Sequence, residues 1–327
     1  QLLQTLVEFD TTSRESNLAL IDFVRTYLQD HGVACELVYN EHKSKANLLA
    51  TIGPAEVPGI VLSGHTDVVP VEGQRWSVAP FDLTEKDGKL YGRGTADMKG
   101  YIACVLACVP ALVKASLRMP VHIALSYDEE VGCLGVRSLL KMLEERPVKP
   151  MLCIIGEPTG LKPVLGHKGK LAMRCDVHGE ACHSAYAPYG VNAIEHAAEL
   201  IGELGRIGQR LRDTRDARFD PPFSTVQTGV MSGGKALNIV PADCRFDFEI
   251  RALPSQDPGE VADQLKAYAE QQVLPRMQAV SAQSAIRFTE LSAYPGLVTD
   301  ERSQAAQLIA DFSGSQEFGT VAFGTEA

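Results

Sequence analysis

The chain has 327 residues, of which 45% are hydrophobic and 22% charged, and its formal net charge is −10. This length exceeds one typical core, so two domains are expected. The negative charge argues against nonspecific nucleic-acid binding, which requires clustered Lys and Arg. No apolar segment approaches the ~20 residues of a membrane span, so no association with a membrane is expected. The eight cysteines lie mostly in apolar segments, which favours reduced thiols and a cytoplasmic location.

The first half of the chain alternates between helical and strand patterns. Apolar residues from Leu20 to Leu28 recur at helical spacing and predict a helix that ends at Gly32. Several short strands are apolar throughout, as in buried parallel sheets. We therefore expect an α/β domain with a mostly parallel sheet and helices on both faces. The other predicted helices span 97–115 and 135–145, and the strands span 34–39, 46–52, 59–64, 120–127 and 151–156.

The pattern changes after residue 165. Residues 170–179 have the pattern of a half-buried strand, and residues 192–211 that of an amphipathic helix. They are followed by two strands at 224–233 and 244–253, a helix at 258–274 and a strand at 284–291. This β-α-β-β-α-β order is the ferredoxin-like α+β pattern. Residues 301–314 and 319–324 return to a helix followed by a buried strand. We therefore expect an inserted domain at 166–289 and a surrounding domain formed by 1–165 and 290–327.

One histidine and five carboxylates stand at junctions between the predicted elements of the first domain. In an open α/β sheet, the carboxyl ends of the strands form the usual ligand crevice. These six residues are therefore expected to gather in one place. They are His65 and Asp67 after strand 59–64, Asp97 at the start of helix 97–115, Glu129 and Glu130 after strand 120–127, and Glu157 after strand 151–156.

Several carboxylates in one crevice require a compensating cation. A single acid at such a junction is more often a helix N-cap, and a single histidine is more often a hydrogen-bonded core residue. Four coincident junctions favour a metal site instead. Imidazole and carboxylates without cysteine suit zinc, cobalt or manganese. Asp67, two residues after His65, is placed to hold the second ring nitrogen of that imidazole.

Longer motifs contain these residues: "SGHTDVVPVEGQRWSVAPFDLTEKDGKLYGRGTADMKG", "YDEEVG", "IGEPTG" and "GEACHSAYAPYGVNAI". In these motifs the chain closely resembles the co-catalytic zinc amidohydrolase family, and the resemblance covers essentially the whole chain. It implies two zinc ions per subunit, for which cobalt can substitute.

The resemblance implies a role for each residue of the crevice. His65 and Glu157 would bind the first zinc, Glu130 the second, and Asp97 would bridge both. Asp67 would orient His65, and Glu129 would be the general base of an amide hydrolysis. The peptide bond between Asp97 and Met98 is expected to be cis. The family's second zinc also takes a histidine beyond the "FGTEA" segment, and the sequence given ends at Ala327 before that position.

In the inserted domain, the resemblance implies contacts with a small N-acyl amino acid substrate. His183 matches a histidine that contacts the substrate, and in dimeric members it reaches the partner's active site. Asn238 and Arg251 match residues that hold the substrate carboxylate, and the planar fork of arginine suits that task. The inserted domain would thus act as a lid and as the interface of a homodimer.

The expected reaction is hydrolysis of the acetyl amide of N-acetyl-L-ornithine through a zinc-activated water. Desuccinylation of a diaminopimelate derivative and a broader aminoacylase or dipeptidase activity are alternatives within the same class. An alternative from another class is a binding protein that keeps the fold without catalysis.

Overall fold

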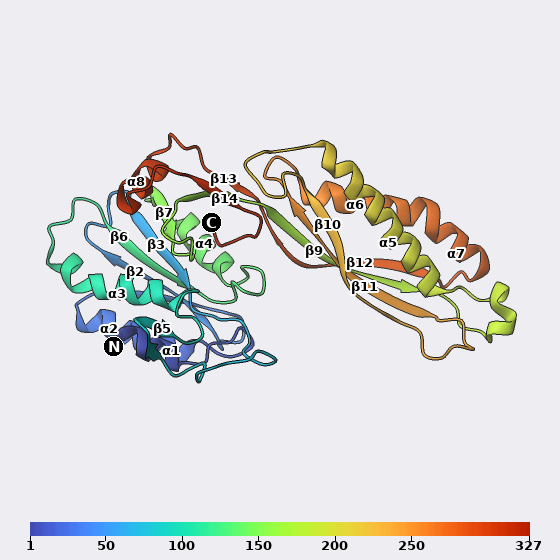
Figure 1. Cartoon of the computed structure of the whole chain (residues 1–327), viewed down its shortest axis with the longest axis horizontal. Coiled ribbons are helices and arrows are strands. Elements are labelled where there is room, and N and C mark those ends of the chain that lie inside the picture. The colour runs from blue at the N-terminus through green and yellow to red at the C-terminus, as the bar shows by residue number, and fades with distance from the viewer. The chain divides into compact units, whose positions relative to one another are not determined.

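The computed structural model describes residues 1–327, which form two compact units. The first unit comprises 1–163, 302–317 and 325–327. The second comprises 164–301 and 318–324. Figure 1 labels most of the elements of both units. None of the helices combines the length and apolar character that a membrane crossing requires.

The first unit contains a five-stranded sheet with the order β1-β2-β6-β3-β7. Its strands are β1 (Cys35–Tyr39), β2 (Ala46–Ile52), β3 (Ile60–His65), β6 (Val121–Ser126) and β7 (Leu152–Ile155). A separate small hairpin pairs β4 (Thr84–Lys86) with β5 (Lys89–Tyr91). The helices are α1 (Leu2–Glu8), α2 (Leu18–Asp30), α3 (Lys99–Lys114), α4 (Val136–Glu145) and α8 (Gln304–Ser313).

The α/β prediction is confirmed, but the sheet is mixed rather than mostly parallel. β3 pairs in parallel with β6 and β7, whereas β2 pairs antiparallel with β1 and β6. The sheet is mixed because the connection between β1 and β2 is short, so that β2 reverses the direction of the chain. This connection is closed by a hydrogen bond from Asn40 N–H to the Lys45 carbonyl at 3.0 Å, and so short a turn can join only antiparallel strands.

Helices cover both faces of this sheet, as predicted. Alternate side chains of a strand point to opposite faces. Leu48 and Ala50 of β2 pack in one cluster with buried residues of α2 and α3, whereas Leu49 packs with Leu139 of α4. β7 is an edge strand, and its residue Cys153 is exposed rather than buried.

The second unit has the predicted β-α-β-β-α-β order. Its antiparallel sheet has the order β10-β11-β9-β12, the ferredoxin-like arrangement. The six elements are β9 (Gly169–His178), α5 (Ala193–Arg210), β10 (Thr225–Gly233), β11 (Asp243–Ala252), α6 (Pro258–Tyr268) and β12 (Ala285–Tyr294). α6 continues through a π-helical turn, Ala269–Val273, into α7 (Leu274–Val280), and 3-10 turns span Ser184–Tyr189 and Leu211–Asp213.

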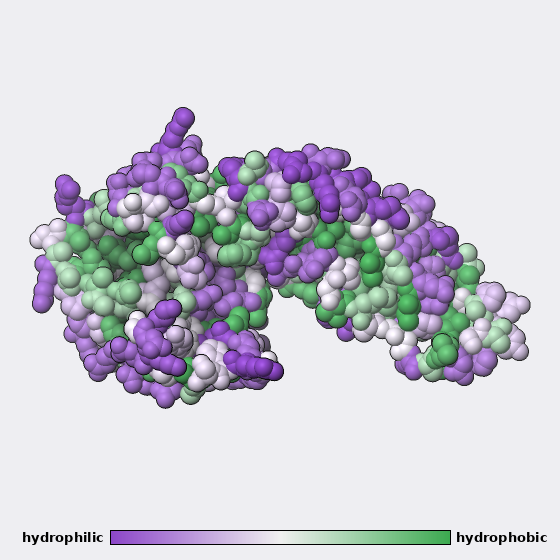
Figure 2. All heavy atoms as spheres, in the orientation of Figure 1, coloured by the Kyte–Doolittle hydropathy of each residue, from purple (hydrophilic) through white to green (hydrophobic).

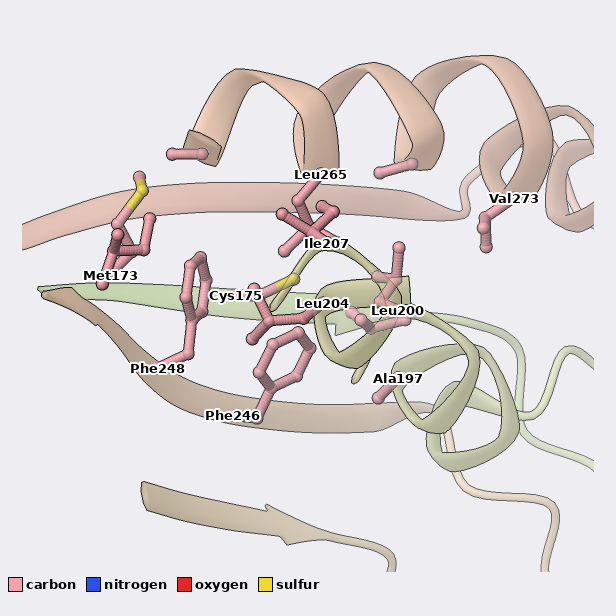
Figure 3. Packing of buried hydrophobic residues seen from close by; sticks show 14 of the residues in the cluster. Met173, Cys175, Ala197, Leu200, Leu204, Ile207, Phe246, Phe248, Leu265 and Val273 are labelled. Carbon is pink, nitrogen blue, oxygen red and sulfur yellow. The ribbon is translucent and has the colours of Figure 1, made fainter. Parts of the chain in front are cut away.

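The core of the second unit lies between this sheet and its helices. Figure 3 shows Phe246 and Phe248 of β11 packed with Met173 and Cys175 of β9 on the helical side. The intervening residues lie on the opposite face, where Arg174 forms an ion pair with Asp247 at 2.8 Å. In Figure 2 hydrophilic residues line the outer edge of the helical layer.

A further small sheet joins β8 (Val164–His167) to β13 (Leu297–Val298) and β14 (Gly319–Val321). β12 runs to Tyr294 and β13 pairs with β8, so the second unit continues beyond residue 289. β14 pairs in parallel with β8 within the second unit, although we expected 319–324 to complete the surrounding domain. The predicted helix at 301–314 is present as α8, and Gly314 ends it at φ 65°.

Candidate active site

His65 is the last residue of β3, and its side chain is buried, with 1% exposed. Its Nδ1 contacts the backbone carbonyl of Asp67 at 2.9 Å, whereas the Asp67 carboxylate lies farther from Nδ1, at 3.5 Å. The nearer partner of the ring is thus the carbonyl of Asp67 rather than the expected carboxylate. In the neutral imidazole, donation from Nδ1 to this carbonyl leaves Nε2 with the free electron pair that a metal ion binds.

His65, Asp97 and Glu157 form a cluster whose ligand atoms all lie within 4.8 Å of one another. The Nε2 of His65 is 3.0 Å from Asp97 Oδ1 and 4.0 Å from Glu157 Oε1. The three residues come from the end of β3, the segment before α3 and the segment after β7. One imidazole and two carboxylates at this separation fit a single divalent ion of the zinc, cobalt or manganese type. Glu130 is not part of this cluster.

The Asp97–Met98 peptide bond is cis, as the resemblance implied. Met98 is fully buried, and its Sδ lies 3.3 Å from the backbone nitrogen of His65. The neighbouring Gly64 leaves room for this methionine, because a Cβ there would lie 2.9 Å from Met98 Cε. The segment that carries Asp97 is therefore packed directly against the end of β3.

Asp67 connects the histidine to the turn that follows β6. Its Oδ1 accepts the backbone N–H of Glu129 at 3.1 Å, and its Oδ2 accepts that of Glu130 at 3.3 Å. The hydroxyl of Ser13 donates to Oδ2 at 2.7 Å. Burial alone would raise the pKa of Asp67, but the interaction with His65 and these hydrogen bonds outweigh it and lower that pKa. Asp67 is therefore a buried carboxylate that stays charged.

The glutamates of the site are strongly affected by burial. Burial, only partly opposed by His65, raises the pKa of Glu129 to about 8 and the pKa values of Glu130 and Glu157 to about 7. Burial lowers the pKa of His65, but its contacts with Asp67 and neighbouring carboxylates hold that pKa well above its ordinary value. A cation bound among these carboxyl groups would favour the charged forms of the glutamates.

Two residues near the base were not assigned a role from the sequence. Glu326 lies in the first unit and hydrogen-bonds to the hydroxyl of Ser126 at the end of β6. Its Oε2 is buried without a hydrogen-bond partner, and burial raises its pKa to about 7. The thiol of Cys133 donates to Glu129 Oε1 at 3.6 Å. Cys133 stands only four residues after Glu129, whereas Glu326, in the "FGTEA" segment, reaches Ser126 across 200 positions through the fold. Neither position carries a local signal for its contact.

The structure places His183, Asn238 and Arg251 in the second unit. His183 and Asn238 are exposed neighbours, since the backbone N–H that follows His183 donates to the Asn238 carbonyl at 3.0 Å. Arg251 is the penultimate residue of β11 and is half-buried. Its guanidinium donates to Glu249 at 3.2 Å and to the hydroxyl of Tyr294 at 2.7 Å.

Comparisons with known proteins agree with this architecture. The profile of peptidase family M20/M25/M40 matches residues 61–310. The acetylornithine deacetylase of Pasteurella multocida (strain Pm70) is 36% identical over 325 residues, covering 99% of this chain and 82% of the relative. The acetylornithine deacetylase of Myxococcus xanthus is 37% identical over 331 residues, covering 99% and 84%.

Solved structures with the same fold are more distant in sequence. An M20 family metallo-carboxypeptidase from Sulfolobus solfataricus has a TM-score of 0.75 at 19% identity, covering 99% of this chain and 85% of that one. A tripeptidase from Staphylococcus aureus has a TM-score of 0.72 at 20% identity, covering 99% and 84%. At such identities these two structures support the fold alone.

Proposed function

Since the chain belongs to peptidase family M20/M25/M40, it is a metal-dependent amide hydrolase, and we propose that it converts N-acetyl-L-ornithine and water to L-ornithine and acetate. The two relatives named acetylornithine deacetylase, at 36% and 37% identity over 99% of this chain, support this substrate. The structural observation that carries the proposal is the cluster of His65, Asp97 and Glu157.

We propose that this cluster holds a first zinc ion and that Asp97 shares a second zinc with Glu130; cobalt would serve in the same place. The spacing of the first three ligand atoms, within 4.8 Å, supports the first site. When bound, the metal would polarise the amide carbonyl and lower the pKa of a water molecule.

Glu129 acts as the general base in this proposal. It takes a proton from the attacking water as the oxygen adds to the acetyl carbon, and it returns that proton to the amine as the C–N bond breaks. Burial raises the pKa of Glu129 above its ordinary value, and a cation bound nearby would favour its charged form, which is the form that accepts a proton. Asp67 holds both His65 and the Glu129 backbone in place.

The second unit would act as a lid and as the interface of a homodimer. His183 and Asn238 would contact the substrate, and Arg251 would bind its carboxylate through a bidentate fork.

We also propose a cytoplasmic location. All eight cysteines are free thiols, which suits a reducing compartment.

Steady-state hydrolysis by the metal-loaded protein tests the proposal. We expect a higher kcat/KM for N-acetyl-L-ornithine than for an N-succinyl-diaminopimelate derivative or for dipeptides. The opposite order would overturn the assigned substrate, and a lack of hydrolysis of any of them would overturn the enzymatic role. Sedimentation at working concentration tests the dimer, which a monomer would contradict.

A further inference from the structure

The hydroxyl of Ser13 supports the turn of Glu129 and Glu130 through Asp67. Ser13 Oγ donates to Asp67 Oδ2 at 2.7 Å, and Asp67 accepts the two glutamate N–H groups at 3.1 and 3.3 Å. Ser13 is 9% exposed and Asp67 2%. Little water can therefore replace the hydroxyl if it is removed.

Lys45 supports the same turn through Asp128. Its Nζ forms an ion pair with Asp128 Oδ1 at 2.5 Å, and the two side chains are only 12% and 17% exposed. Asp128 directly precedes Glu129 and has a φ of 58°, a left-handed conformation that non-glycine residues seldom adopt. The Nζ of Lys45 also donates to the carbonyl of Ser13. The two supports therefore meet at Ser13.

Ser13 is itself held by a short pairing of two chain segments. Its N–H donates to the Val68 carbonyl at 3.1 Å, and the Val68 N–H donates to the Thr11 carbonyl at 3.1 Å. The Thr11 hydroxyl donates to the Thr66 carbonyl at 2.6 Å. The segment after α1 is thus fixed alongside the residues that follow His65.

We propose that Ser13 and Lys45 are positioning residues that set the orientation of Glu129 and Glu130. Both act at a distance, Ser13 through Asp67 and Lys45 through Asp128. This inference rests on the proposed function, because it assumes that Glu129 is the base and Glu130 a metal ligand. Loss of either support would let the turn relax. The expected consequences are a misplaced base and a weakened metal site.

The test uses Ser13→Ala and Lys45→Met in the full chain. Cobalt is added to the metal-depleted protein and followed by its visible absorption, and kcat and KM are measured on N-acetyl-L-ornithine. We expect each variant to bind cobalt more weakly with an altered spectrum and to lose ~10- to 100-fold in kcat, with a smaller change in KM. Ser13→Thr and Lys45→Arg, which keep the hydroxyl and the charge, should recover most of the loss.

Two matched controls lie in the second unit. Ser281→Ala removes a serine–carboxylate hydrogen bond of 3.0 Å to Glu180, and Lys266→Met removes an ion pair of 2.8 Å to Asp263. Both should keep the wild-type cobalt spectrum and kcat. If Lys45→Met does not fold, Asp128→Asn removes the same ion pair from the other partner.

Three outcomes would overturn the inference. The first is a lower melting temperature with unchanged cobalt affinity, spectrum and kcat, because that indicates a purely structural role. The second is a failure of the conservative variants to restore function. The third is a wild-type chain that binds no cobalt. If the wild-type chain binds cobalt but does not hydrolyse acetylornithine, the assigned substrate is wrong, and the cobalt measurements still decide the positioning role.

Discussion

The carboxylate of Asp67 accepts the backbone N–H of Glu129 at 3.1 Å. The same side chain accepts the N–H of Glu130, and its own backbone carbonyl contacts the ring of His65. One residue therefore fixes both the histidine of the cluster and the turn of the two glutamates. With their amides held, the adjacent side chains of Glu129 and Glu130 can serve two separate purposes.

Replacement of Glu129 by Gln tests the proposed base. The amide cannot accept the proton of water, so we expect kcat to fall by ~10²- to 10⁴-fold while the amount of metal bound per chain is unchanged. Elemental analysis and steady-state kinetics measure the two quantities. Glu145→Gln, on the exposed end of α4, is the matched control and should leave kcat and the metal content unchanged. Near-normal turnover of the Glu129 variant would show that another group is the base.

Replacement of Asp67 by Asn tests its connecting role. An amide offers one oxygen in place of two, so it cannot accept from Ser13, Glu129 and Glu130 as the carboxylate does. We expect the affinity for cobalt or zinc to fall by ~10- to 100-fold. Competition with a chromophoric chelator measures that affinity. An unchanged dissociation constant would contradict the assigned role.

The stability of the metal-free protein should decrease as pH rises from about 5 to 8. Glu129, with a pKa of about 8, and Glu130, Glu157 and Glu326, with pKa values of about 7, keep protons in the folded state that the unfolded chain releases near pH 4.5. The raised pKa of His65 acts in the same direction. The folded state thus binds more protons in this range, so the free energy of unfolding falls with pH.

Added metal should oppose this trend, because it binds the deprotonated carboxylates. Thermal unfolding with zinc and with a chelator, at pH 5.5 and at pH 8, measures the effect. The rise in Tm on adding metal should be larger at pH 8. An equal rise at both values would argue against carboxylate ligation.

Tyr294→Phe tests how Arg251 is held. The substitution removes the oxygen that accepts from Arg251 Nη1 at 2.7 Å and from the Gly324 N–H at 3.1 Å. If Arg251 binds the substrate carboxylate, KM should rise with little change in kcat, because such binding is equal in the ground and transition states. Tyr39→Phe, a half-exposed tyrosine of the first unit, is the control. A fall in kcat alone would point to a different role for Arg251.

Local pattern explains which elements could be predicted. The alternating pattern of residues 170–179 predicted β9, and the amphipathic pattern of residues 192–211 predicted α5. The β-α-β-β-α-β order was predicted from the same strand and helix periodicities. The antiparallel pairing of β1 with β2 was missed because the apolar composition of a strand does not report the direction of its neighbour. The exposed position of Cys153 was missed for a similar reason, since an apolar strand can lie at the edge of a sheet.

The sequence by itself determined an α/β unit and an α+β unit, the residue types of the candidate metal cluster and their placement after strands, because periodicity and spacing are properties of neighbouring residues. Only the tertiary structure decided which of those residues meet. It brought His65, Asp97 and Glu157 within 4.8 Å and left Glu130 outside that cluster. It also joined Ser13 to Asp67 across 54 positions and Lys45 to Asp128 across 83. Such contacts arise from the packing of whole strands and helices, and no local pattern of side chains encodes them.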